Sequence, residues 1–166
     1  MTAHREAAQN SAAAHHAPVP ATVRGGRTTR ALDSAEALRL LGSVGLGRIV
    51  FTQSALPAIR PVNHIIDNGD IVIRTHEGAA LTLVTEQAGE TGVVVAYEAD
   101  KIDPDTHLGW SVVVTGYARR VTDPPSLAHY QRLLEPWVDQ AMDYAVCIHP
   151  EIITGFRLAE STSPLD

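Results

Sequence analysis

The sequence predicts an α+β fold in which a six-stranded, mostly antiparallel β-barrel is flanked by helices. Short β-branched segments bounded by turn residues fill most of the chain, and hairpin-length connections join them. The clearest turn is Asp67-Asn68-Gly69-Asp70, since Asn-Gly suits the turns that match strand twist. Hairpin connections make neighbouring strands antiparallel, and closure into a barrel removes exposed strand edges.

The elements follow in order along the chain. A helix begins at Asp33 or Ser34, carries Glu36 in its first turn and ends in the glycines of 42–47. Further helices are expected over 76–87 and 125–135, with a short one over 136–143. The expected strands cover residues 48–52, 57–66, 70–75, 92–100, 109–121 and 144–159.

The length of 166 residues indicates one folded domain, over residues 31–160. Residues 1–30 have no apolar period and predict a disordered N-terminal tail, and residues 161–166 predict a flexible C-terminus. The tail has four arginines and one glutamate, whereas the remainder carries a net charge of −9. An acidic body argues against nucleic-acid binding, which needs clustered basic charge.

The chain shows no membrane, disulfide or metal signature. Cys147 is the single cysteine, so no internal disulfide can form. No apolar run approaches the roughly 18 residues of a membrane span, and residues 1–30 lack the apolar region of a signal peptide. We therefore expect a cytoplasmic protein without membrane contact and without a metal site.

Several short segments resemble one protein family when taken in order. The sequence runs through Arg60-Pro61-Val62-Asn63, then Ile73-Arg74-Thr75 with Glu77-Gly78 and Leu81, then Tyr97-Glu98-Ala99-Asp100, then Gly109–Gly116 (GWSVVVTG). This series is similar to the pyridoxamine 5′-phosphate oxidase-like FMN-binding split-barrel family, in its actinobacterial branch. The similarity extends over roughly residues 31–160.

The resemblance implies a homodimer with FMN in clefts at the subunit interface. The residues it assigns to the cofactor are Arg60, Pro61, Val62, Asn63, Arg74, Thr75, His76, Trp110 and Ser111. Their chemistry agrees with this assignment. Guanidinium groups suit a phosphate dianion, hydroxyl groups complete its shell, and an indole offers stacking surface to a flavin ring.

One departure from the family pattern concerns the phosphate. Many relatives have a lysine or arginine just before the leucine of the Gly-x-x-Leu segment, where this chain has Ala79 and Ala80. We expect either weaker FMN binding or a substitute contact from His76.

The expected function is that of a flavin-dependent oxidoreductase acting on a small-molecule substrate. The flavin would supply the redox chemistry, so no catalytic residue is assigned to the chain. The alternatives are a deazaflavin-dependent reductase and a non-catalytic module that binds flavin or haem.

Overall fold

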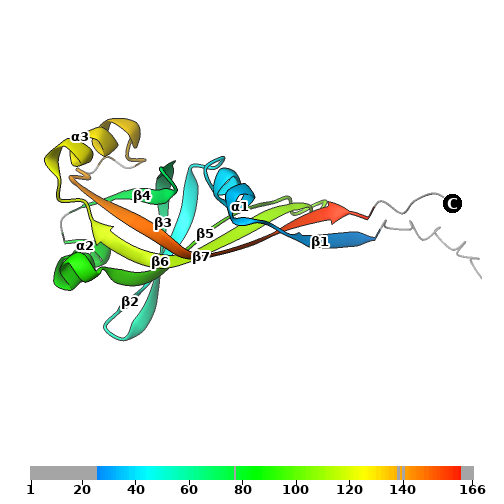
Figure 1. Cartoon of the computed structure of the whole chain (residues 1–166), viewed down its shortest axis with the longest axis horizontal. Helices are drawn as coiled ribbons and strands as arrows, with labels where there is room; N and C mark the ends of the chain where they lie inside the picture. The colour runs from blue at the N-terminus through cyan, green and yellow to red at the C-terminus, as the bar shows by residue number, and fades with distance from the viewer. Residues whose placement is uncertain (1–25, 77, 138, 140, 162–166) are drawn as a thin grey trace, which may run out of the picture.

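The computed structural model describes residues 26–76, 78–137, 139 and 141–161 (Figure 1). Its strands are β1 (Arg27–Ala31), β2 (Leu46–Gln53), β3 (Leu56–Asp67), β4 (Asp70–Thr75), β5 (Val93–Ile102), β6 (Gly109–Arg120) and β7 (Tyr144–Glu160). Its helices are α1 (Ser34–Leu41), α2 (Ala80–Ala88) and α3 (Pro124–Leu133), with a 3₁₀ turn at Gly89–Thr91.

The strands form one sheet that closes on itself. Its order is β1-β7-β4-β3-β2-β5-β6, and β6 also pairs with β7, so β2 to β7 make a closed six-stranded ring. All of these pairings are antiparallel. The α+β split barrel expected from the sequence is therefore confirmed.

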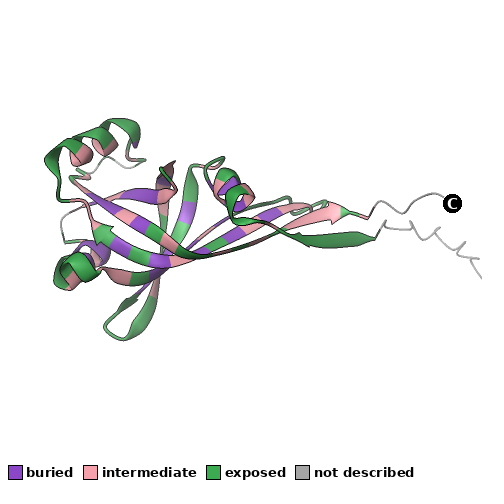
Figure 2. Cartoon of the chain, in the orientation of Figure 1, coloured by how far each residue is buried: buried purple, intermediate pink, exposed green. Residues whose placement is uncertain are grey.

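Alternation along the strands builds the interior. In β6, Trp110, Val112 and Val114 are buried, while Val113 between them is exposed. Figure 2 shows this alternation of buried and exposed residues along β6. Apolar side chains that point inward, among them Ile49 and Tyr97, form one core that removes apolar surface from water.

Local signals set the predicted helix start and the main turn. Asp33 caps α1 by accepting a hydrogen bond from the backbone N–H of Glu36. Asn68 and Gly69 both have positive φ, at 51° and 90°, as an Asn-Gly hairpin turn requires. Both predictions are confirmed.

Two predicted boundaries need correction. Arg27–Ala31 forms β1, so residues 27–30 are not a disordered tail; residues 1–25 and 162–166 lie outside the described residues. The five β1 residues are exposed, and the strand is held by pairing with the far end of β7, from Phe156 to Glu160. A strand that buries no side chain leaves no hydrophobic pattern in the sequence.

The short helix expected over 136–143 is also wrong for the described residues of that range, none of which is helical. Carbonyl groups at the two ends of this connection, from Leu134, Glu135 and Met142, accept hydrogen bonds from side chains of β3 and β4. These contacts attach both ends of the connection to the barrel.

Candidate functional site

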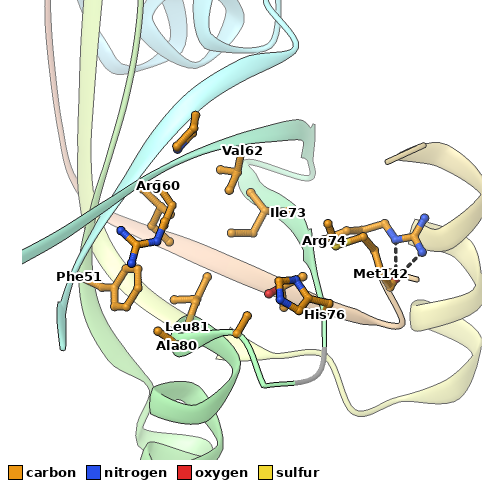
Figure 3. A pocket seen from close by; sticks show the side chains of 13 residues that line it. Phe51, Arg60, Val62, Ile73, Arg74, His76, Ala80, Leu81 and Met142 are labelled. Atoms are coloured by element: carbon orange, nitrogen blue, oxygen red, sulfur yellow. Dashed lines mark hydrogen bonds between the residues drawn. The ribbon is translucent and has the colours of Figure 1, made fainter. Parts of the chain in front are cut away.

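A cavity of about 360 Å³ opens at one end of the barrel, between β3, β4 and the start of α2 (Figure 3). Much of its wall is apolar. The apolar and alanine lining comes from β2, β3, β4, α2 and the segment before β7: Ile49, Phe51, Pro61, Val62, Ile73, Ala79, Ala80, Leu81 and Met142. The remaining lining residues are Arg60, Arg74, Thr75 and His76. All three ionisable side chains in this lining are therefore basic or can become so, and a cavity of this kind favours an anionic ligand with a flat apolar part.

Arg60 supplies a cation at the cavity. It is an exposed residue of β3, and within the described part of the chain its guanidinium donates one hydrogen bond, to the neighbouring Ile59 carbonyl at 2.7 Å. A guanidinium has five N–H donors, so most of the donors of Arg60 remain available to a ligand.

The N-terminus of α2 supplies backbone donors. Ala79 occupies the N-cap position with an extended backbone, and no side chain caps the helix there. The first N–H groups of a helix have no partner within it, and the helix dipole makes this end attractive to anions. Ala79, Ala80 and Leu81 line the cavity, so the uncapped end borders it.

Threonines fix the approach to this helix. Thr82 donates from its hydroxyl to the His76 carbonyl at 2.8 Å. The buried hydroxyls of Thr75 and Thr82 lie 3.2 Å apart, and since the Thr82 proton is already donated, Thr75 is the donor of that bond. These bonds connect the end of β4 and the cavity-lining His76 with the first turn of α2.

The polar groups of Arg74 and Asn63 are hydrogen-bonded to the end of α3 and to residues between α3 and β7. Ile73 and Thr75 face inward and are buried, so Arg74 between them leaves the barrel on its outer side. Its guanidinium donates to carbonyl oxygens of the α3 end and of the segment before β7, at 2.9 Å to Leu134 and 2.9 Å from Nε to Met142. Asn63 donates to the Glu135 carbonyl at 2.7 Å.

The structure thus brings six of the nine residues assigned from the resemblance to one cavity: Arg60, Pro61, Val62, Arg74, Thr75 and His76. The other three do not line it. Trp110 is 5% exposed and belongs to the core, Ser111 lies on β6 between Asp100 and Phe156 of the adjacent strands, and Asn63 is turned to the α3–β7 segment.

Several lining residues escaped the sequence analysis. Ile49 and Phe51 were recognisable as inward positions of an alternating strand, but nothing local marked them as a cavity wall. Met142 reaches the cavity only because the segment before β7 passes it, which is a tertiary property.

Among the residues that the structure describes, no group of three or more His, Cys, Asp or Glu side chains is placed to hold a metal ion. No described helix is long and apolar enough to cross a membrane.

Comparison with known proteins identifies the family. Residues 33–157 match the family model described as pyridoxamine 5′-phosphate oxidase. The chain belongs to this family of split-barrel proteins.

Three relatives illustrate the similarity. An uncharacterized protein of Mycobacterium tuberculosis is 55% identical over 134 residues, which is 80% of this chain and 88% of the relative. A crystal structure from Corynebacterium glutamicum, provisionally described as a pyridoxamine 5′-phosphate oxidase, has a TM-score of 0.67 and 35% identity over 81% of this chain and 96% of its own. A FAD-binding protein of Mycobacterium smegmatis has a TM-score of 0.60 and 37% identity over 78% of this chain and 100% of its own.

Proposed function

We propose that this protein binds FMN in the cavity between β3, β4 and α2, and that it works as a flavin-dependent oxidoreductase on a small-molecule substrate. The observation that carries the proposal is that one cavity combines an apolar wall with basic groups at its edge. Arg60 and the uncapped end of α2 both border this cavity. A flavin nucleotide has the matching form, a flat ring system joined to a phosphate.

The phosphate would bind between Arg60 and the first turn of α2. Most N–H donors of Arg60 are available, and the first backbone N–H groups of α2 have no acceptor within the helix. His76 lies at the same rim and would add a further donor. These groups would replace the basic side chain that many relatives have where this chain has Ala79 and Ala80.

The flavin ring would lie against the apolar wall. Val62 and Ile73 come from adjacent strands, and Phe51 and Leu81 lie at the other side of the cavity in Figure 3. Burial of these surfaces against a ring would contribute about 25 cal/mol per Å² of apolar area removed from water.

The chemistry of such a protein belongs to its cofactor, because bound flavin accepts or passes a hydride. The residues of this chain would bind and orient it. The positive charge of Arg60 would hold the phosphate, and the apolar wall would exclude water from one side of the flavin ring.

A second form of the cofactor is favoured by one specific observation. The Mycobacterium smegmatis relative, 37% identical, is described as FAD-binding. FAD shares the flavin ring and the first phosphate with FMN, so the same contacts would hold both, and the added adenosine monophosphate would lie outside the cavity described here.

We also propose that the protein is a homodimer whose subunits meet on the outer face of β5, β6 and β7. Val94 and Ile152 are each 60% exposed there, and Val113, Tyr117 and Phe156 are also exposed. Val94 lies opposite Tyr117, and Ile152 opposite Thr115, so these exposed side chains share the outer face of the three strands. The resemblance places Ser111 of β6 at this boundary, where it would contact the cofactor of the second subunit.

The test is titration of the purified apoprotein with FMN, followed by quenching of flavin fluorescence. Arg60→Ala removes a charged hydrogen bond and should raise the dissociation constant about tenfold to a hundredfold. Arg39→Ala, an exposed arginine of α1, is the control and should bind like wild type. Parallel titration with FAD separates the two cofactor forms. A wild-type protein that binds neither flavin, or an Arg60→Ala variant that binds FMN unchanged, would contradict the proposal.

A further inference from the structure

Resting on the proposed function, we infer that Arg74 is a positioning residue of the flavin site and not a ligand of the phosphate. It fastens α3, and the segment that leads from α3 into β7, to the outer side of β4. The inference concerns a residue that the family resemblance would place on the phosphate.

The hydrogen bonds of Arg74 all lead to this segment. Nη1 donates to the carbonyl oxygens of Leu134 at 2.9 Å and Gln131 at 3.4 Å, Nε donates to Met142 at 2.9 Å, and Nη2 also donates to Met142. In Figure 3 the guanidinium extends away from the cavity toward Met142, whereas the stem of Arg74 lines the cavity. One side chain therefore joins the end of α3 to the start of β7.

The position of α3 depends on such polar contacts. None of the residues of α3 is buried, so the helix has little apolar packing to hold it on the barrel. Leu134, just after the helix, is its buried anchor. Two further side chains help: Tyr130 donates to Asp67 at 3.0 Å, and Asn63 donates to the Glu135 carbonyl. Arg74 makes the most of these polar contacts, because it donates hydrogen bonds to three different carbonyl groups.

The acceptors explain why an arginine is suited to this place. The last carbonyl groups of a helix have no partner within it, and cationic side chains stabilise that end. If Arg74 turned to a phosphate in the cavity, the carbonyls of Gln131, Leu134 and Met142 would lose its hydrogen bonds together. Arg60, with donors that remain available, meets no such competition.

The consequence for the site comes through Met142. Met142 lines the cavity, and its carbonyl is the oxygen that Arg74 contacts twice. Loss of Arg74 would therefore loosen one wall of the cavity. The cavity would then bind every ligand more weakly, whether or not the ligand carries a phosphate.

A first experiment needs no ligand. Hydrogen exchange measured by mass spectrometry on the full chain should be faster over residues 124–137 in Arg74→Ala than in wild type. Exchange in α1 should be the same in both proteins. Trypsin should also cut faster after Arg132, an exposed residue in the last turn of α3. Arg74→Lys should recover part of the protection, because an ammonium can still donate to these carbonyls. Arg60→Ala and Arg39→Ala should leave exchange over 124–137 as in wild type. Unchanged exchange and cleavage in Arg74→Ala would overturn the inference.

A second experiment compares FMN with riboflavin, which lacks the phosphate. A positioning role predicts that Arg74→Ala weakens both flavins by the same factor, about tenfold, so that the ratio of their dissociation constants stays at the wild-type value. Arg60→Ala should weaken FMN alone and therefore raise the ratio of the FMN dissociation constant to the riboflavin dissociation constant. A loss confined to FMN in Arg74→Ala would make Arg74 a phosphate ligand and overturn the inference. If wild type binds neither flavin, the proposed function fails, and the exchange experiment still decides what Arg74 holds.

Discussion

The hydroxyl of Tyr97 lies 2.7 Å from Nδ1 of His64 inside the barrel, with the two rings packed edge to face. The other ring nitrogen, Nε2, lies 2.9 Å from the Leu41 carbonyl at the end of α1. A carbonyl only accepts, so Nε2 carries the proton, Nδ1 accepts, and Tyr97 is the donor. His64 thereby connects β5 with the end of α1, one residue after Asn63 of the strand that borders the cavity.

Replacing Tyr97 with phenylalanine should lower the free energy of unfolding by about 1–3 kcal/mol, because Nδ1 of the buried His64 loses its donor. Urea denaturation of Tyr97→Phe measures the change. Tyr144→Phe, at a half-buried ring at the start of β7, is the control and should differ from wild type by less than about 0.5 kcal/mol. Equal stability of the two variants would mean that the hydrogen bond to His64 contributes nothing.

The stability of the protein should fall in mild acid because of the same histidine. Burial lowers the pKa of His64 below its ordinary value, an effect partly opposed by the Leu41 carbonyl. Below about pH 6.5 the unfolded chain binds a proton at this position that the folded protein does not bind, so acid favours unfolding. His64→Gln cannot titrate, and its free energy of unfolding should decrease less than that of wild type between neutral pH and the lowered pKa. Parallel pH profiles of the two proteins would contradict this.

Gly47 should not tolerate a side chain. A Cβ at this position would lie 2.4 Å from the hydroxyl oxygen of Tyr97 and 2.6 Å from two of its ring carbons. Gly47→Ala should therefore destabilise the protein by about 1–3 kcal/mol or more through overpacking. Gly45→Ala is a matched control two residues away, where a Cβ would make an ordinary 3.8 Å contact with Trp137. Thermal melts of both variants give the comparison, and similar melting temperatures would refute the predicted clash.

The proposed dimer predicts a mass of about twice 17.8 kDa by light scattering. Ile152→Asp places a charge in the centre of the apolar face of β5, β6 and β7 and should shift the protein toward the monomer, because a desolvated unpaired charge is costly. Leu83→Asp, at an exposed apolar position of α2, should leave the mass unchanged. A monomeric wild type would exclude this interface.

Much of the fold follows from local sequence. β-Branched runs such as RIVFT and GWSVVVTG predicted strands, Asp33 set the start of α1, and Asn68-Gly69 set a turn, because each of these signals acts within a few residues. The ordered motifs of the sequence also indicated the family. Six of the nine residues that the family resemblance assigned to the cofactor line the cavity.

Tertiary structure decided the rest. β1 exists because β7 offers it a pairing edge, and the segment after α3 is not helical where Arg74 and Asn63 bind its carbonyls. The sequence alone made Arg60 and Arg74 look equivalent, as two arginines on neighbouring strands. They differ because one guanidinium has most of its donors available at the cavity, whereas the other is hydrogen-bonded to a segment about sixty residues further along the chain. A residue's hydrogen-bond partners are set by which distant segment packs beside it, and no local pattern encodes that.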